Sequence, residues 1–337
     1  MNVLRKILFP FAILYGLITT IRNFLFDKGI LKSTSFDIPV IAVGNLSVGG
    51  TGKTPQIEYL IRLLSDKYKV ATLSRGYKRK SEGFLLADST SNAEILGDEP
   101  FQFYQKFPDI QVAVDANRTN GIIQLLSQIE KPEVILLDDA YQHRKVKAGF
   151  YILLTAFDDL YADDFMLPTG NLRESRSGAN RASIIVVTKC PKNLSDEKQE
   201  EIRLKLELNP SQQIYFTYVD YDDAVYGKGK KIDVRDIKSE PKLLLAGIAK
   251  PKPFFNFLKS EKDECLTFPD HHHFSDTDLD EIQNKAKNKK IITTEKDYVR
   301  LKDSELVSQL YYLPIKSTFI NHQQNFDEAI LEYVKRD

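Results

Sequence analysis

The sequence predicts an α/β protein in which a mostly parallel sheet, flanked by helices, is followed by a second, smaller α/β domain. Unbroken runs of Val, Ile and Leu alternate with amphipathic helical stretches along most of the chain. Such runs are typical of parallel strands that are buried on both faces. Of the 337 residues, 42% are hydrophobic and 28% are charged. This is ordinary usage for a globular protein and argues against a disordered chain.

An apolar segment precedes this α/β region, and we expect it to form a membrane-associated helix. Residues 7–21 carry no charge, and Arg5, Lys6 and Arg22 flank them. Apolar positions recur at helical spacing, although the run is shorter than the roughly 20 residues of a spanning helix. Four basic residues and one acidic residue lie within the first 30 positions, which favours a helix lying on an anionic membrane surface. The alternatives are a helix buried against the protein and a true membrane span.

Strand and helix signals then alternate from residue 38 onward. The first predicted strand covers 38–43 and ends at Gly44. The apolar residues 57, 60, 61 and 64 after it share one face of an amphipathic helix, because they are spaced three and four positions apart. Further strands are expected at 70–73, 110–114, 134–137, 151–154 and 183–187, and helices at 118–128 and 197–208.

A polar stretch rich in Gly and Lys, residues 226–231, is the best candidate for a domain boundary. Beyond it, strand signals at 243–246, 291–292 and 311–313 alternate with helical stretches at 252–258, 276–287 and 326–334. The predicted organisation is therefore an apolar helix over residues 1–30, a larger domain over 31–225 and a smaller α/β domain over 226–337.

Charge and cysteine content exclude several classes of protein. The 47 basic residues balance the 47 acidic ones, so we expect no nucleic-acid partner bound through bulk positive charge. Cys190 and Cys265 are far apart and belong to no CxxC pattern. They predict neither a disulfide framework nor a zinc site, and they fit a reducing compartment.

The most informative segment lies between the first strand and the first helix, where a phosphate-binding loop is expected. It matches the pattern GxxxxGK[ST] except that Ser47 replaces the first glycine. Its glycines allow the backbone to wrap closely around phosphates, Lys53 would reach the terminal phosphates, and Thr54 would ligate Mg²⁺. This P-loop predicts an NTPase-like fold, and the residues expected to bind the nucleotide are Ser47, Val48, Gly49, Gly50, Thr51, Gly52, Lys53 and Thr54.

An acidic pair follows a neighbouring strand, as a nucleotide-dependent enzyme of this type requires. Residues 134–137 end in Asp138 and Asp139. Adjacent carboxylates on a strand point to opposite faces, so we expect one to coordinate Mg²⁺, directly or through water, and the other to orient a ligand or cap a loop. Glu99 is a further candidate metal ligand, and the sequence does not order these carboxylates.

Together these motifs resemble the tetraacyldisaccharide 4′-kinase (lipid A 4′-kinase) family over almost the whole chain. In order, the matching pieces are the apolar N-terminal helix and residues 44–55, 73–77, 97–100, 138–143, 168–174, 268–272 and 293–297. The resemblance implies transfer of the ATP γ-phosphate to the 4′-hydroxyl of a tetraacylated glucosamine disaccharide 1-phosphate, giving lipid IVA in lipid A biosynthesis. It also implies a location at the cytoplasmic face of the bacterial inner membrane, and it implies no protein partner.

The resemblance further assigns residue roles. It places Asp98 and His271 together as a dyad in which Asp98 takes the proton of the 4′-hydroxyl, in a cleft between the two domains. From the residues alone, Glu99 could take the part of Asp98, and His272 that of His271. Arginine side chains suit phosphate recognition. The candidate substrate-binding residues within matched motifs are Arg75, Tyr77, Arg173 and Glu174.

The alternative is a membrane-associated P-loop switch ATPase or GTPase without a lipid acceptor. Regulatory ATPases often carry a second lysine early in the loop, where this chain has Val48. Guanine recognition usually requires an Asn/Thr-Lys-x-Asp step, and the candidate step at Thr188 has Pro191 in place of the aspartate. ATP is therefore expected by exclusion.

Overall fold

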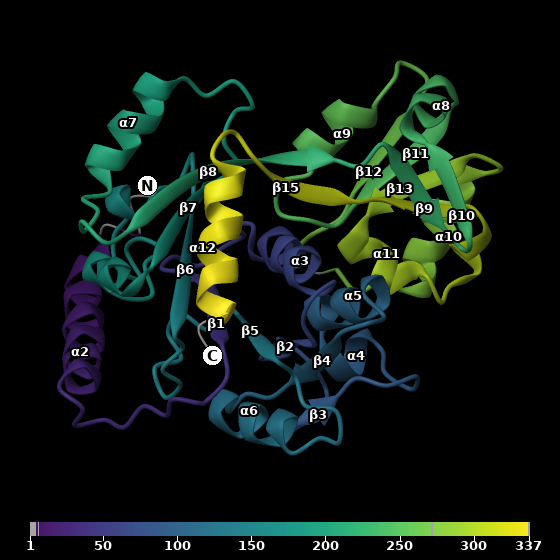
Figure 1. The fold of residues 1–337 in the computed structure, drawn as a ribbon. Helices are drawn as coiled ribbons and strands as arrows, with labels where there is room; N and C mark the ends of the chain where they lie inside the picture. Colours follow the sequence, from purple (N-terminus) through teal and green to yellow (C-terminus); the bar gives the residue numbers. More distant parts are fainter. Residues whose placement is uncertain (1–4, 6, 271, 336–337) are drawn as a thin grey trace.

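The computed structural model describes residue 5, residues 7–270 and residues 272–335. Its larger sheet has the strand order β15-β8-β7-β6-β1-β5-β2-β4-β3, and the pairs from β8 to β4 are parallel. In chain order these strands are β1 (Val40–Asn45), β2 (Val70–Ser74), β3 (Leu85–Leu86), β4 (Gln111–Val114), β5 (Val134–Asp138), β6 (Phe150–Ala156), β7 (Ile184–Thr188), β8 (Gln213–Tyr221) and β15 (Ile315–Phe319). The mostly parallel sheet predicted from the sequence is confirmed (Figure 1).

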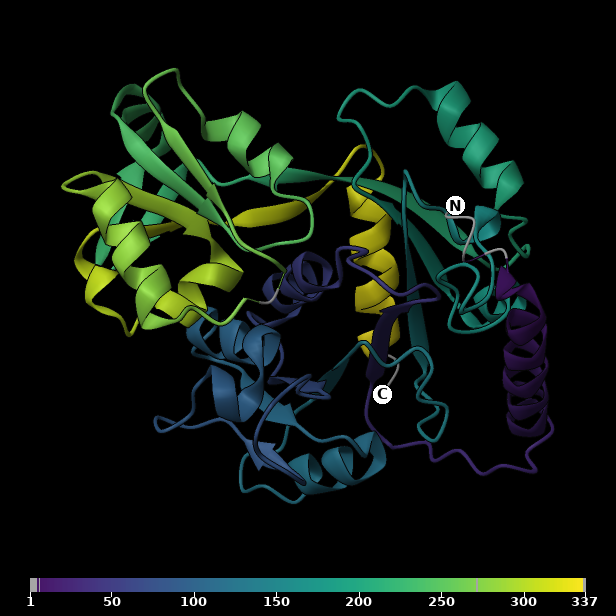
Figure 2. The same cartoon turned by 180° about the vertical axis from the view of Figure 1, so that it is seen from behind.

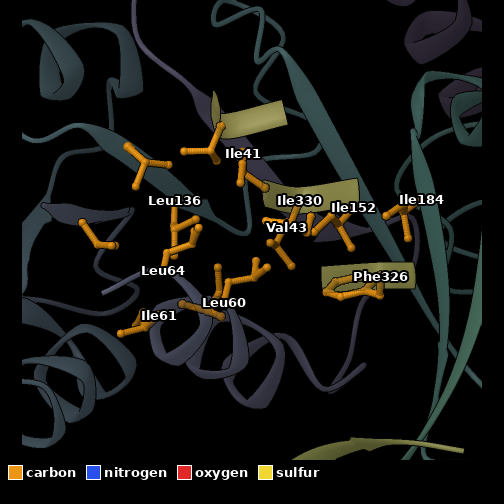
Figure 3. Close-up of a cluster of buried hydrophobic side chains, with 14 of the residues drawn as sticks. Ile41, Val43, Leu60, Ile61, Leu64, Leu136, Ile152, Ile184, Phe326 and Ile330 are labelled. Atoms are coloured by element: carbon orange, nitrogen blue, oxygen red, sulfur yellow. The ribbon is translucent and has the colours of Figure 1, made fainter. Parts of the chain in front are cut away.

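Helices cover both faces of this sheet, because alternate residues of its central strand β1 point to opposite sides. Ile41 and Val43 belong to one core cluster with α3 and α12 (Figure 3). Val40 and Ala42 belong to a second cluster with α6. All six residues of β1 are buried. The helices associated with this sheet are α3 (Lys53–Leu64), α4 (Ala93–Leu96), α5 (Asp98–Lys106), α6 (Arg118–Leu126), α7 (Asp196–Lys205) and α12 (Gln323–Lys335). We call this assembly the larger lobe.

A second sheet with its own cores forms the smaller lobe. Its strand order is β10-β9-β14-β13-β11-β12, with parallel pairing from β14 to β12. The strands are β9 (Ala224–Gly227), β10 (Lys230–Asp233), β11 (Lys242–Ala246), β12 (Glu264–Thr267), β13 (Lys290–Thr294) and β14 (Leu310–Leu313). One face packs on α8 (Val234–Ser239) and α9 (Lys252–Leu258), and the other on α10 (Asp276–Ala286) and α11 (Glu295–Leu301).

The chain returns to the larger lobe at its C-terminal end, which corrects the expected extent of the smaller domain. Strand β15 pairs antiparallel with β8 along the edge of the larger sheet. Phe326 and Ile330 of α12 are fully buried in the same cluster as Ile41. The predicted range 226–337 therefore runs too far, because residues from about 315 onward bury their apolar side chains against the larger sheet.

The lobes meet where α5 of the larger lobe packs against α11 of the smaller lobe. Lys106 on α5 lies between two buried carboxylates, with its Nζ 2.7 Å from Glu58 and 2.5 Å from Glu295. Glu58 belongs to α3 and Glu295 is the first residue of α11. This ion-pair cluster joins three helices across the contact between the lobes.

Helix α2 (Phe9–Asp27) stands at the edge of the larger lobe, on the side away from the smaller lobe (Figures 1 and 2). It begins with Pro10 in its first turn, as expected. By length and composition it is long and apolar enough to cross a membrane, and 11% of its apolar window is buried. The alternative of a helix buried against the protein is therefore wrong. Its exposed apolar side chains are Phe9, Phe11, Ile13, Leu14, Leu17, Ile18, Ile21 and Phe24.

Candidate active site

The phosphate-binding loop connects the end of β1 to the start of α3, as predicted. Gly52 is the N-cap of α3 with φ = +85°, a conformation that strongly favours glycine. The loop is anchored from the end of β7, where Thr188 Oγ1 donates a hydrogen bond of 2.8 Å to the carbonyl of Thr51. Lys189 Nζ donates to the carbonyl of Gly50. The N–H groups at the start of α3 can therefore face an anion, as in other helix N-terminal phosphate sites.

Lys53 lies close to the predicted acidic pair. Its Nζ is 3.6 Å from Asp139 Oδ1 and 3.4 Å from Asn45 Oδ1. The Asn45 side chain is fully buried, and its Nδ2 donates a hydrogen bond of 2.6 Å to the carbonyl of Ser47. Asn45 thus connects the lysine to the beginning of the loop.

Asp138 and Asp139 occupy different environments, although they are adjacent. Burial, together with the charge of Asp139, raises the pKa of Asp138 to about 6. Burial also acts to raise the pKa of Asp139, but Lys53 and Arg173 outweigh it and bring that pKa below its usual value. Arg173 contacts both Asp139 oxygens, at 2.9 Å and 3.3 Å. The two carboxylates are therefore suited to different tasks.

The predicted metal ligands do not converge on one closed site. Asp138 Oδ1 is buried without a hydrogen-bond partner among the described residues, whereas Ser74 Oγ lies 3.3 Å from Oδ2. Glu99 is instead paired with Lys296, with Oε1 and Nζ 2.6 Å apart. Within residues 5, 7–270 and 272–335, no group of three or more His, Cys, Asp or Glu side chains could hold a metal ion. The unpartnered Asp138 Oδ1 is an oxygen donor that suits a cation sharing its coordination with phosphate oxygens, as Mg²⁺ commonly does.

Asp98 is the first residue of α5 and faces the smaller lobe. Its carboxylate forms an ion pair with Arg300 Nη2 on α11. Arg300 is fixed in turn by Asp297, whose Oδ1 lies 3.4 Å from Nη1. The side chain of Asp297 is fully buried and accepts hydrogen bonds from the Gly247 amide and from Thr294 Oγ1, at 2.9 Å and 2.7 Å. The smaller lobe therefore presents a braced arginine to the predicted base.

Glu99, the neighbour of Asp98, binds the same helix of the smaller lobe. Burial acts to raise its pKa, but the ammonium of Lys296 outweighs this and holds the pKa below its usual value. The charge of Glu99 also contributes to the raised pKa of Asp138. The start of α5 thus lies near the carboxyl end of β5, as a shared site requires.

The predicted dyad histidine, His271, lies outside the described residues. Its alternative, His272, contacts α10, because its Nε2 lies 3.0 Å from Asp278 Oδ2. The ring of His272 also stacks on Phe268, with centroids 4.8 Å apart. His272 is therefore held by contacts within the smaller lobe.

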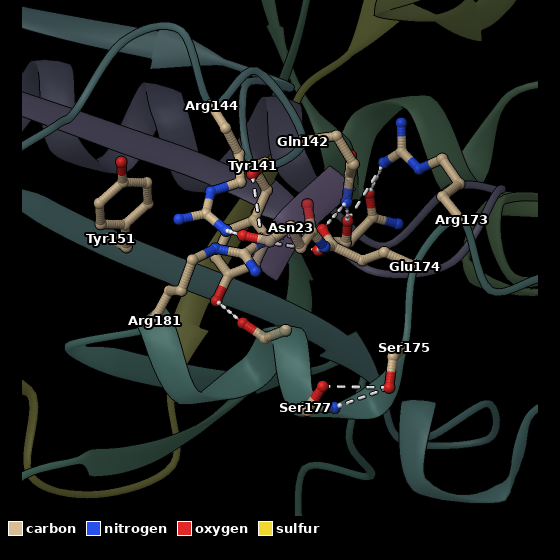
Figure 4. Close-up of polar contacts among 12 residues, drawn as sticks. Asn23, Tyr141, Gln142, Arg144, Tyr151, Arg173, Glu174, Ser175, Ser177 and Arg181 are labelled. Carbon is tan, nitrogen blue, oxygen red and sulfur yellow. Dashed lines mark hydrogen bonds and ion pairs between the residues drawn. The ribbon is translucent and has the colours of Figure 1, made fainter. Parts of the chain in front are cut away.

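The four candidate substrate-binding residues fall into two groups. Arg75 and Tyr77 follow β2 and are exposed, with Tyr77 63% accessible. Arg173 lies beside the phosphate-binding loop, with its Nη2 bound to Asn45 Oδ1. Glu174 is 1% exposed and is surrounded by protein partners (Figure 4). Its carboxylate accepts hydrogen bonds from Asn23, Gln142 and Arg181, and its contact with substrate stays a prediction.

Several residues of the site were not identified from the sequence. Asn45, Gln142, Lys296 and Arg300 each contact a predicted site residue or its neighbour. Three of them lie in motifs that carry the family resemblance, which was the available signal. Arg300 lies beyond the last motif, and its partner Asp98 is 202 positions away.

Comparison with known proteins agrees with the motifs. The profile of the family described as tetraacyldisaccharide-1-P 4′-kinase (LpxK) matches residues 4–335. Tetraacyldisaccharide 4′-kinase of Flavobacterium johnsoniae is 85% identical over 337 residues, covering 100% of this chain and 99% of that protein. The protein of the same name from Bacteroides thetaiotaomicron is 45% identical and covers 99% of this chain and 94% of its own length.

A solved structure shows the same relationship. The crystal structure of LpxK from Aquifex aeolicus in complex with ATP matches with a TM-score of 0.81 and 30% identity, covering 98% of this chain and 100% of that one. This likeness over the whole length does not favour the alternative of an acceptor-free switch ATPase or GTPase. The chain belongs to the tetraacyldisaccharide 4′-kinase family.

Proposed function

We propose that this chain transfers the γ-phosphate of ATP to the 4′-hydroxyl of a tetraacylated glucosamine disaccharide 1-phosphate, giving lipid IVA. The observation that carries the proposal is the arrangement of Lys53 and Arg173 around Asp139, directly beside the phosphate-binding loop. Phosphoryl transfer depends mainly on positioning and on neutralising phosphate charge. Two cations held next to the loop by a buried asparagine and a carboxylate suit this task.

In this proposal, the larger lobe binds the triphosphate and supplies the base, and the smaller lobe orients that base. The loop N–H groups and Lys53 bind the triphosphate, and Arg173 stabilises charge on the transferred group. Asp98 accepts the proton of the sugar hydroxyl, and the dyad with His271 remains part of the proposal. Arg300 holds the Asp98 carboxylate in place from the smaller lobe. Exposed Arg75 and Tyr77 are the proposed contacts for the acceptor.

Mg²⁺ is the proposed cation. When bound, it neutralises phosphate charge. Asp138 and Thr54 are the residues that would hold it, because Asp138 Oδ1 is buried without a partner among the described residues and Thr54 lies in the first turn of α3. Asp139 and Glu99, which were also candidates, instead orient Lys53, Arg173 and Lys296.

We further propose that α2 places the enzyme on the cytoplasmic face of the inner membrane, where an acylated acceptor would reside. The helix exposes a broad apolar surface, and apolar helices with basic flanks bind anionic bilayers. Its apolar side chains would then be removed from water, which supplies a favourable free energy of binding.

Acceptor dependence tests the kinase proposal. The full-length chain is incubated with γ-labelled ATP, with and without a detergent-dispersed tetraacyl disaccharide 1-phosphate, and label in lipid and in free phosphate is measured. We expect label in the lipid and little free phosphate without acceptor. Hydrolysis that proceeds at the same rate without acceptor, with unlabelled lipid, would contradict the proposal.

A further inference from the structure

Helix α2 packs on the larger lobe through its polar face, the reverse of an amphipathic helix in a water-soluble protein. Small residues allow close approach: Ala12 and Thr19 are buried, and a Cβ at Gly16 would lie 3.5 Å from Met166. Such spacing of small residues is typical of closely packed helices. The polar side chains beside them reach specific partners on the larger lobe.

Among the described residues, three side chains of this face donate hydrogen bonds to the larger lobe. Tyr15 OH donates to the carbonyl of Arg173 at 3.0 Å, and Arg22 Nη2 donates to the carbonyl of Gln142 at 2.7 Å. Asn23 Nδ2 donates to Glu174 Oε2 at 2.7 Å. We call these three bonds the polar seam, and Figure 4 shows the one between Asn23 and Glu174.

The partners in the polar seam are the residues that fix the end of β1. Gln142 Nε2 donates to the carbonyl of Asn45 at 2.8 Å and to Glu174 Oε1 at 2.9 Å. Arg173 Nη2 contacts both the carbonyl and the side chain of Asn45. Glu174 is further held by Arg181 at 2.9 Å. Two partners of the polar seam, Arg173 and Gln142, contact Asn45 directly. The third, Glu174, contacts Asn45 through Gln142.

Asn45 passes this constraint to the phosphate-binding loop, because its side chain contacts Lys53 Nζ and the Ser47 carbonyl. Asn45 and Glu174 are almost completely buried. Hydrogen bonds to a buried carboxylate are among the stronger ones in proteins, and buried polar networks hold their members in one arrangement.

We infer that Asn23 and Tyr15 are positioning residues for the ATP site. The apolar helix thus has a second role beside anchoring: its polar face sets the geometry of Asn45, Arg173 and, through them, Lys53. This inference rests on the proposed function for its effect on the kinase reaction, whereas its effect on ATP binding can be measured alone.

The test compares full-length variants in detergent, where attachment to a bilayer is not limiting. Asn23→Ala removes the hydrogen bond to Glu174, and Asn23→Asp places a carboxylate against it. We expect ATP affinity and kcat/KM for ATP to fall about tenfold in Asn23→Ala, the scale of one charge-assisted hydrogen bond. Asn23→Asp should lose more, and Asn23→Asp/Glu174→Gln should recover part of that loss. Binding to vesicles of anionic phospholipid should stay unchanged throughout.

Asp27→Asn is the matched control, because Asp27 also joins α2 to the larger lobe, through Arg144 at 2.6 Å, but is exposed. It should behave as wild type. If Asn23→Ala does not fold, Tyr15→Phe removes one hydrogen bond while keeping the ring, and about threefold weaker ATP binding is expected.

Wild-type ATP affinity and kcat/KM in Asn23→Ala or Tyr15→Phe would overturn the inference, as would a loss confined to vesicle binding. A wild-type chain that binds ATP but does not phosphorylate the acceptor would instead reject the proposed function. The ATP affinities of the same variants would then still decide the positioning role.

Discussion

The guanidinium of Arg300, on a helix of the smaller lobe, is paired with the carboxylate of Asp98 at the start of a helix of the larger lobe. The proposed base is therefore oriented by a residue from the opposite lobe. Asp297 holds Arg300 from a fully buried position, so the guanidinium of Arg300 has little freedom to reorient within the smaller lobe.

Replacing Arg300 should therefore affect the chemical step. We expect Arg300→Gln to lower kcat about 10-fold to 100-fold with a smaller change in the KM for ATP, because a displaced base acts in the transition state. Steady-state kinetics with saturating acceptor measure both constants. Arg235→Gln is the control, since Arg235 lies on the same lobe and pairs with Asp233 at the exposed surface. An increase in KM alone would contradict the proposed role.

Lys53 should be required for turnover. Lys53→Ala removes the charge next to Asp139 and the phosphate-binding loop, and we expect kcat to fall at least about 10²-fold, as for other electrostatic contacts to transferring groups. Lys67→Ala changes the same residue type just beyond the same helix, where Lys67 is exposed, and should retain activity. Near-wild-type turnover by Lys53→Ala would reject the assignment of the loop.

The cluster around Lys106 predicts a pH dependence of stability. Burial, together with the charge of Glu58, raises the pKa of Glu295 from its ordinary value of 4.5 to about 7, although Lys106 opposes this. A carboxyl group whose pKa is higher in the folded state binds its proton more tightly there. Its contribution to stability is complete below about pH 4.5 and is lost as the pH rises through about 7.

Glu295→Gln should accordingly flatten this dependence. The groups around the carboxyl are Glu58, which also pairs with Arg62, then Lys106 and the Ile315 amide. Thermal unfolding of wild type and variant at pH 5 and pH 8 measures the effect, and the wild type should lose more Tm between them. Glu261→Gln, at an exposed position, should follow the wild type. An equal loss of Tm in Glu295→Gln would refute the assignment.

The exposed face of α2 should control membrane binding without supporting the fold. Leu17 and Phe24 are 55% and 54% exposed, so Leu17→Ser/Phe24→Ser removes apolar surface worth about 1.5–3 kcal/mol per side chain when fully buried. We expect weaker co-sedimentation with anionic vesicles and an unchanged Tm. Ile129→Ser changes a fully exposed apolar residue outside α2 and should leave vesicle binding intact. A large drop in Tm would indicate that the apolar face packs within the protein.

The features predicted correctly from the sequence are those that depend on residues close together in the chain. The buried runs of β1 and β5 and the glycine-rich loop after β1 follow from residues that are neighbours in the chain. Strand β15 was missed, because Ile315–Phe319 is half-buried and carries Lys316 among polar residues. Its pairing with β8 joins segments about a hundred residues apart, and no local signal reports such a contact.

The same limit applies to the site and to α2. The family motifs indicated Asp98 and Lys53, but Arg300 meets Asp98 through tertiary folding alone. The apolar spacing of α2 predicted a helix and its exposed face. It did not predict that Asn23 and Tyr15 would form hydrogen bonds with residues near the nucleotide loop. Helical spacing shows which side chains share a face of the helix, but it does not show which residues that face contacts.

The return of β15 and α12 to the larger sheet also has a consequence for biosynthesis. Tyr221 and Ile315 are opposite each other where the chain leaves and re-enters that sheet. During translation, the edge strand and the helix that fills the core beneath Ile41 therefore leave the ribosome only after the smaller lobe. The nascent larger lobe must persist with an open edge and an unfilled apolar groove until the smaller lobe has been made.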